Sequence, residues 1–462
     1  MIDDRLGRRT YLGYALGSVG TAGFSTVPGL LLAYYLTNAL GVAAAIAAFV
    51  VLLPKLWDVV FLPIVGTLSD RSAQRRGSRR PFLLVGGVSL PLLFVLMFAT
   101  PAALGEAGSA LWVLVFFLLA ASAFALFQVP YIAMPAEITD SVEERTTMMS
   151  WRVAFLAFGI LLFGVGAPAL RDLGSGGSSG YLLMGIVVAS VIALGMLGCW
   201  WMLRRTRPAP ADVSGHGSHS LREQFAVAWH TRAFRFLLSA FVLQAFATAA
   251  MLGGAQYFAT YVLGKEGMSD VLFAALIVPA LIVMPGWAWV GHRWGKRAGY
   301  LVSSVAFMVG ALLLLASRSL PTAAVLAIVG LCGVGYAGMQ MFPLAMLPDA
   351  IAVDAASSGR QRAGAFTGVW TAGETVGFAV GPALVLILLA LTGFVSSTGT
   401  AAEQPESALT GVLLAFSVLP AVLVAVSLPL IRRFELDTTS LNTTSLGTSS
   451  SQPPATRPGG HA

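Results

Sequence analysis

The chain has 462 residues, of which 57% are hydrophobic and only 11% are charged. Soluble domains carry about 25% charged residues, so this composition excludes an ordinary soluble globular protein and indicates a membrane protein. The formal net charge of +7 would suit a nucleic-acid-binding protein, but the positions of the cationic residues, described below, favour a membrane topology signal and no nucleic-acid partner.

About a dozen apolar runs of roughly 18 to 25 residues follow one another, which is the length that crosses a bilayer as a helix. We therefore predict an all-α membrane protein with twelve transmembrane helices in two pseudo-symmetric six-helix bundles. The predicted spans are 11–38, 43–69, 82–102, 110–135, 148–170, 181–203, 234–263, 270–292, 299–317, 321–347, 364–392 and 409–431.

Composition shifts between the runs predict four parts of the chain. They are an N-terminal bundle (1–203), a Pro/Gly/Ser-rich cytoplasmic linker (204–233), a C-terminal bundle (234–436) and a Ser/Thr-rich, disordered cytoplasmic tail (437–462).

The cationic residues fall on one side of this layout. With twelve spans, the odd-numbered loops hold only Arg171, Lys265 and Arg318, while Lys55 and Arg152 lie in or at the edge of spans. The remaining Lys and Arg residues share the side of both termini. Cytoplasmic loops of membrane proteins are rich in Lys and Arg, so we expect both termini in the cytoplasm and the chain in an inner or plasma membrane.

Two motif pairs indicate that the halves are related. AMPAEI (133–138) ends the fourth span as AMLPDAI (345–351) ends the tenth, and PIVGTLSDR (63–71) ends the second as PGWAWVGHR (285–293) ends the eighth. Transporters are often built from two repeats with the substrate site between them near the bilayer midplane. The repeat therefore favours a transporter.

An acidic residue, Asp58, lies inside the second span. It precedes Asp70, at the end of that span, by about 12 residues, or roughly 18 Å along a helix, close to the middle of the hydrocarbon core. A carboxylate at this depth must face a cavity or a partner. Lys55 lies one turn earlier on the same face. The two residues form either a structural ion pair or a site at which Asp58 binds a coupling cation.

Two further charges lie in predicted spans. Glu374 sits roughly 16 Å inside the eleventh span, either as a buried hydrogen-bonded glutamate or as a second coupling carboxylate. Arg152 lies near the inner end of the fifth span, where its side chain either reaches the lipid headgroups or binds an anionic or hydroxyl-rich group in a cavity.

Polar and aromatic residues at similar depth complete the candidate substrate site. With Arg152 they are Gln128, Tyr131, Gln256, Gln340 and Trp370. Aromatic faces beside amides suit sugar binding, and each of these residues taken alone also suits helix packing. No histidine lies deep in a predicted span, which argues against a membrane metalloenzyme or hydrolase, and we expect no enzyme activity, metal or cofactor.

The stretch GTLSDRSAQRRGSRRP resembles the signature of the major facilitator superfamily, through Gly66, Asp70, Arg71, Arg75 and Arg76. The resemblance implies a twelve-helix transporter with alternating access that is monomeric by default. It also implies that these five residues form a cytoplasmic gate that links the two halves while the inner side is closed.

KLWDVVFLPIVGTLSDRS further resembles the glycoside–pentoside–hexuronide cation symporters, the melibiose permease family. This resemblance implies that Asp58 belongs to a cation site and Arg152 to a sugar site. This chain has Phe61 and Leu62 where sodium-coupled members carry a polar and an acidic residue, so we expect protons rather than sodium. Ala22 and Gln128 replace acidic residues of sugar-binding members, and Glu374 replaces a lysine.

These observations together predict a cation-coupled symporter, with protons as the coupling ion, for a glycoside or a similar small organic solute. Its partners are that solute, the cation and the lipid bilayer. Three alternatives stay open at this point. They are a proton-driven exporter of a drug or metabolite, a carrier of lysolipids or other amphiphiles, and a membrane receptor that does not transport.

Overall fold

The computed structural model describes residues 6–76, 78–139, 141–174, 177–204, 206, 229–358, 363–398 and 402–434. All regular secondary structure in these ranges is helical. The predicted tail and most of the predicted linker lie outside the described residues, so these two parts stay predictions.

Long helices that cross the molecule make up both halves. The first half comprises α1 (Arg8–Val27), the π-helical turns η1 (Pro28–Leu32) and η2 (Tyr35–Ala39), α2 (Ala44–Arg76), α3 (Arg80–Phe98), η3 (Ala102–Leu104), α4 (Gly105–Ile138), α5 (Val142–Leu173) and α6 (Ser178–Leu203). The second half comprises α8 (Arg232–Tyr257), η4 (Phe258–Val262), η5 (Glu266–Met268), α9 (Ser269–Ile282), α10 (Met284–Trp294), α11 (Lys296–Leu313), η6 (Leu314–Ser319), α12 (Thr322–Ser358), α13 (Ala363–Leu391), α14 (Glu406–Phe416) and α15 (Val418–Arg432).

Eleven helical segments of the described chain are each long and apolar enough to cross a membrane, and α9 and α10, bent by 49°, make a twelfth if they count as one span. The bent pair corresponds to the eighth predicted span. Pro285 follows the break directly, and because proline has no N–H to continue the helical hydrogen bonds, it favours a break there. The all-α prediction is confirmed, and its eighth span is the broken one.

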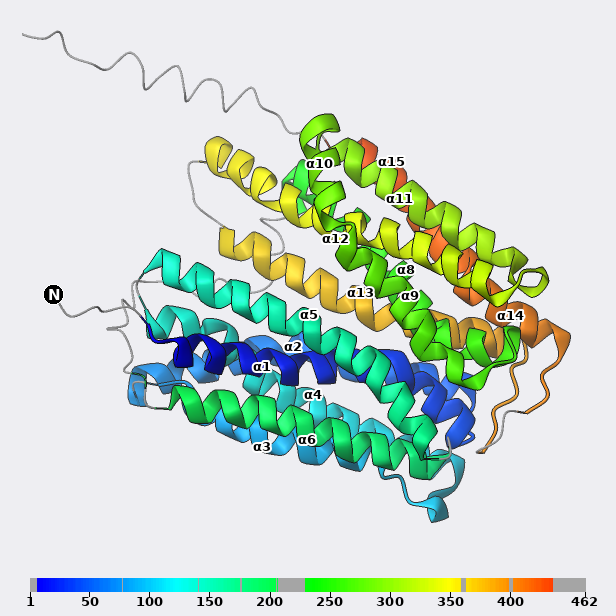
Figure 1. Cartoon of the computed structure of the whole chain (residues 1–462). Coiled ribbons are helices and arrows are strands. Elements are labelled where there is room, and N and C mark those ends of the chain that lie inside the picture. The colour runs from blue at the N-terminus through cyan, green and yellow to red at the C-terminus, as the bar shows by residue number, and fades with distance from the viewer. Residues whose placement is uncertain are drawn as a thin grey trace, which may run out of the picture.

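The helices form two bundles that lie side by side (Figure 1). In the first half, α1 packs against α5 and α6, and α3 against α4 and α6; in the second, α8 packs against α13 and α15, and α11 against α12 and α15. The bundles meet mainly where α2 packs on α13 and α5 packs on α9.

Charge distinguishes the two ends of the molecule. We call the end at which α1 begins the basic end and the opposite one the far end. Exposed cationic side chains at the basic end include Arg8, Arg9, Arg71, Arg75, Arg293, Lys296, Arg297, Arg432 and Arg433. The far end has Arg171, Lys265 and Arg318 near the helix ends. The charge asymmetry predicted from the sequence is therefore a difference between the two ends of the fold. Which end faces the cytoplasm stays a prediction.

Candidate functional site: charged and aromatic residues in the middle of the bundles

The predicted Lys55–Asp58 pair forms in the middle of α2. Asp58 is 5% exposed, and its Oδ2 lies 3.9 Å from the Lys55 ammonium. The other carboxylate oxygen, Oδ1, is buried without a hydrogen-bond partner. The ammonium also lies over the rings of Phe24 and Phe117, 5.6 and 5.8 Å from their centroids. A buried carboxylate that has one unpartnered oxygen and only a long ion pair can still bind a proton or a cation.

Tyr131 of α4 is anchored on α1. Its hydroxyl donates to the Tyr14 carbonyl oxygen (2.7 Å) and contacts the Ser18 hydroxyl (2.8 Å), and its ring stacks on that of Tyr14 with centroids 4.7 Å apart. Gly17 makes this approach possible, because a Cβ there would lie 2.6 Å from the Tyr131 ring. The fully buried Tyr131 therefore has one fixed position.

Arg152 of α5 reaches over this anchored ring. Its guanidinium carbon lies 5.6 Å from the Tyr131 centroid, and its Nε is buried without a hydrogen-bond partner. Gln128, one turn before Tyr131 on α4, likewise has a buried Oε1 without a partner. The structure thus brings the Arg152 guanidinium to the buried Tyr131 rather than directing it to the end of the span.

The second half contributes a matching group of residues on α12 and α13. Trp370 is 3% exposed, stacks on Phe241 (4.4 Å between centroids) and has a buried indole Nε1 without a partner. Glu374 follows one turn later on α13 and interacts electrostatically with Tyr336 of α12, which hydrogen-bonds to Gln340. Trp370 and Glu374 therefore share one face of α13, and Gln340 is linked to Glu374 only through Tyr336. Tyr336 was missed, because nothing in the sequence shows which residues of α12 lie near Glu374.

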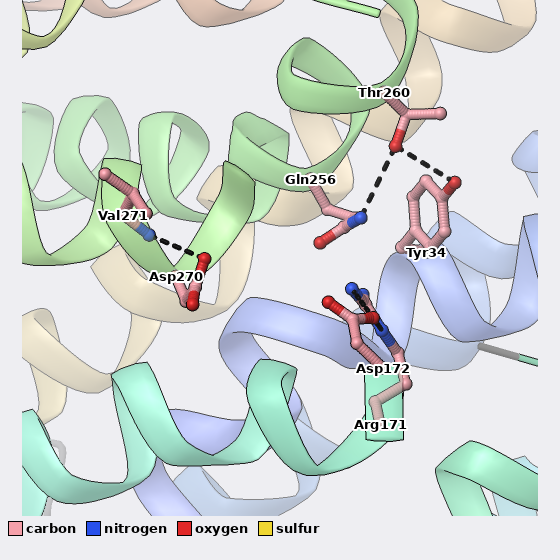
Figure 2. A network of polar contacts seen from close by, with 7 residues as sticks. All are labelled: Tyr34, Arg171, Asp172, Gln256, Thr260, Asp270 and Val271. Carbon is pink, nitrogen blue, oxygen red and sulfur yellow. Dashed lines mark hydrogen bonds and ion pairs between the residues drawn. The ribbon is translucent and has the colours of Figure 1, made fainter. Parts of the chain in front are cut away.

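Gln256 occupies a different place from the other predicted substrate residues. It lies in the last turn of α8 at the far end, where its amide donates to the Thr260 hydroxyl (3.4 Å). Tyr34 donates to the same hydroxyl from the first half (3.2 Å), as Figure 2 shows, with Arg171 and Asp172 of α5 close by. Gln256 thus belongs to the contact between the halves at the far end, and its substrate role stays a prediction.

The hydrogen bonds that join described residues of the two halves gather at the far end. Thr37 and Tyr257 share a hydrogen bond of 2.7 Å, Asn38 donates to the Tyr261 hydroxyl, and the Ser397 N–H donates to the Thr37 carbonyl (2.9 Å). This contact was not predictable from the apolar runs alone. The run YYLTNA, polar at the end of an apolar span, was the available signal.

The predicted gate residues lie at the basic end, in the last turns of α2. Gly66 faces α4, where a Cβ would lie 4.0 Å from Val129, and Arg71 and Arg75 are exposed. The side chains of Asp70 and Arg76 lie outside what the structure describes. Their gate role stays a prediction.

An ion pair close to these residues stays within one half. The Arg79 guanidinium pairs with Glu137 of α4. The Arg79–Glu137 pair therefore helps to hold the first bundle together.

Comparison with known proteins places this arrangement in a family. Residues 13–438 match the family described as MFS/sugar transport protein. The chain belongs to this family. Its members are transporters rather than enzymes, and the predicted membership in the major facilitator superfamily is confirmed.

Relatives of this family member cover most of its length. It is 26% identical to the putative glycoside/cation symporter YagG of Escherichia coli K12, over 90% of this chain and 89% of that protein. It is 23% identical to the glucuronide carrier protein homolog of the same organism, over 86% of each chain. A sodium-dependent lysophosphatidylcholine symporter (1-A) of Danio rerio is 23% identical over 73% of this chain and 69% of that protein.

Solved structures share the fold. The nucleoside transporter NupG matches with a TM-score of 0.62 and 13% identity, over 92% of this chain and all of that one (100%). A bacterial homolog of the human lysosomal transporter Spinster matches with a TM-score of 0.64 and 12% identity, over 97% and 98% of the two chains. At this identity the likeness establishes the major facilitator fold and nothing about substrate.

Proposed function

We propose that this family member is a proton-coupled symporter of a glycoside or a similar small organic solute. The observation that supports coupling most directly is Asp58, a carboxylate 5% exposed in the middle of a membrane span with an unpartnered oxygen. An ionisable group at that depth is expensive and marks an ion or substrate path. The relative named as a glycoside/cation symporter supports the same class of transport.

The surroundings of Asp58 favour a proton over sodium. Hard metal cations prefer several oxygen ligands, whereas a proton needs one carboxylate. Asp58 has a lysine as its ion-pair partner, and the next residues on its helix face are Phe61 and Leu62. Within the described ranges, three or more His, Cys, Asp or Glu side chains nowhere gather as a metal site. Glu374 is the second candidate for the coupling carboxylate.

Alternating access follows from the contact between the bundles. The far end is closed by hydrogen bonds between the halves, such as Thr37 to Tyr257, so this is the state in which solute would enter or leave at the basic end. We place the basic end and both termini in the cytoplasm of a cell inner or plasma membrane, with the chain as a monomer. In the opposite state, Gly66, Asp70, Arg71, Arg75 and Arg76 would close the basic end.

The solute would bind between the halves. Arg152, Gln128 and Tyr131 would contact it from the first bundle and Trp370 and Gln340 from the second, because Arg152, Gln128 and Trp370 carry buried polar atoms without partners. Gln256 would cover it on the far side.

Proton movement in de-energised cells tests the proposal. Glycosides, uronic acids and organic cations are added singly to a weakly buffered suspension, with and without sodium. We expect alkalinisation with at least one sugar derivative that does not need sodium, is lost in Asp58→Asn and is kept in Glu406→Gln, whose carboxylate is exposed at the far end. Alkalinisation that persists in Asp58→Asn would refute the role of Asp58.

A second candidate function is a carrier of amphiphiles. It is favoured by the similarity to the sodium-dependent lysophosphatidylcholine symporter of Danio rerio. Uptake of a lysophospholipid that requires sodium and leaves the external pH unchanged would favour this candidate over the proton-coupled glycoside symporter.

A further inference from the structure

Two opposite charges stand at comparable depth in the two halves. Arg152 lies 10 residues after the start of α5 at Val142, and Glu374 lies 11 residues after the start of α13 at Ala363. Both helices start at the basic end, so the two residues stand about 15 and 16 Å inside the molecule. The Arg152 guanidinium lies over the Tyr131 ring of α4, and Glu374 interacts electrostatically with Tyr336 of α12.

Neither charge is neutralised by the part of the protein that the structure describes. The ion pairs among described residues include neither Arg152 nor Glu374. Lys55 and Asp58, in the middle of α2, pair with each other. Isolated charges inside a membrane protein are costly and are retained where a ligand or an opposite charge meets them. Arg152 and Glu374 therefore lack an opposite charge among the residues that the structure describes.

The groups around each charge fit the two ends of one solute. On the first half, the Arg152 Nε–H and the Gln128 Oε1 are both buried without partners. On the second half, Trp370 lies one turn before Glu374 and its indole N–H is also unpartnered and buried. Polar atoms that are buried without partners in a folded protein call for a ligand or water. Here they flank a positive charge in one half and a negative charge in the other.

We propose that the transported solute is dipolar. Its cationic group, an ammonium, binds Glu374, its anionic group, a carboxylate, binds Arg152, and its hydroxyl groups bind the flanking amide and indole groups. A neutral solute would leave both charges without a counter-charge in a desolvated site, and a singly charged solute would leave one. This inference rests on the proposed function, because it names the substrate class of the same site.

The test uses four probes that share one pyranose ring. They are glucose, glucuronate, glucosamine and 2-amino-2-deoxyglucuronate, which are neutral, anionic, cationic and dipolar at neutral pH. Binding to the purified full-length protein is measured as the shift in melting temperature over a concentration series. We expect the dipolar sugar to bind at least about tenfold more tightly than the other three, because hydrogen bonds to charged groups are the strong ones.

Two variants separate the charges. Glu374→Gln removes the site for the ammonium, so the preference should move to glucuronate. Arg152→Gln removes the site for the carboxylate, so the preference should move to glucosamine. Glu406→Gln and Arg318→Gln, from an exposed ion pair at the far end, serve as matched controls and should keep the preference for the dipolar sugar.

Three results would overturn the inference. In the first, the wild-type protein binds glucose, glucuronate or glucosamine as tightly as the dipolar sugar. In the second, no probe shifts the melting temperature. In the third, both variants lose binding of all four probes equally, as expected if Arg152 and Glu374 pair with each other in another state. The inference and the proposed function can be refuted independently. Proton-coupled uptake of a neutral glycoside would refute the dipolar solute but leave proton coupling standing. Binding of the dipolar sugar without proton movement would refute proton coupling but leave the dipolar solute standing.

Discussion

At the scale of single residues, the candidate site depends on how closely α1 approaches α4. Gly17 leaves room for the Tyr131 ring, whose hydroxyl is held by Tyr14 and Ser18. Arg152 lies over the ring that these contacts fix. A residue remote from any solute therefore sets the position of the guanidinium that we expect to bind it.

Gly17→Ala tests this dependence. The new Cβ would lie 2.6 Å from the Tyr131 ring, and overpacking of this kind costs about 1–3 kcal/mol. We expect a melting temperature several degrees lower, measured on the purified protein, together with weaker solute binding. Gly166→Ala is the control, since a Cβ there has open space, and an equal effect of both substitutions would contradict the argument.

At the scale of helices and turns, hydroxyl groups from both halves close the far end. Thr37 lies in the π-helical turn η2 after α1, and Tyr257 ends α8 just before the π-helical turn η4. The two halves thus use similar irregular turns at the same end, and the Tyr34 and Tyr257 rings meet there edge to face, 5.1 Å apart.

Tyr257→Phe removes the hydrogen bond to Thr37 and keeps the ring. One such bond contributes about 0.5–1.5 kcal/mol, so the ratio of open to closed far ends should rise about two- to tenfold. The measurement is labelling of Ser397→Cys by a thiol reagent, with Cys199 and Cys332 buried and silent. Tyr300→Phe is the control, because the Tyr300 hydroxyl is buried without a partner. Unchanged labelling in Tyr257→Phe would show that this hydrogen bond does not stabilise the closed far end.

The elements themselves were largely predictable, and their contacts were not. A backbone in a bilayer must satisfy its own hydrogen bonds, so long apolar runs had to become helices. The break at Val283 was missed because the apolar run continues across it. Gln256 was expected at a depth similar to that of the other substrate candidates, whereas the structure has it in the last turn of α8 at the far end. Sequence distance places a residue along its helix but does not show which neighbouring helix it meets.

At the scale of the whole molecule, the charge asymmetry of the two ends predicts orientation. Loops rich in Lys and Arg stay in the cytoplasm, so the basic end should face inward. A cysteine at exposed Arg75 should react with a membrane-impermeant reagent only after cells are permeabilised, and one at Arg318 should react in intact cells. The reverse labelling pattern would show that the basic end faces outward. The closed far end would then face the cytoplasm.

The closed state also depends on a close contact between the two bundles. Gly164 of α5 faces Phe273 of α9, and a Cβ at Gly164 would lie only 1.9 Å from the Phe273 ring. Phe273 is 3% exposed, so its ring has little room to move away. Gly164→Ala should therefore hold the bundles apart at the far end. Because the transporter must close there, we expect solute uptake to fall several-fold.

Removing the ring should relieve this clash. We expect the double variant Gly164→Ala with Phe273→Ala to recover uptake relative to Gly164→Ala alone, with protein levels matched by immunoblot. Recovery would show that the two single changes act through one contact, as neighbouring residues do. If the double variant is no better than Gly164→Ala, the loss of uptake comes from damage to α5 itself and not from the failure of the two bundles to close.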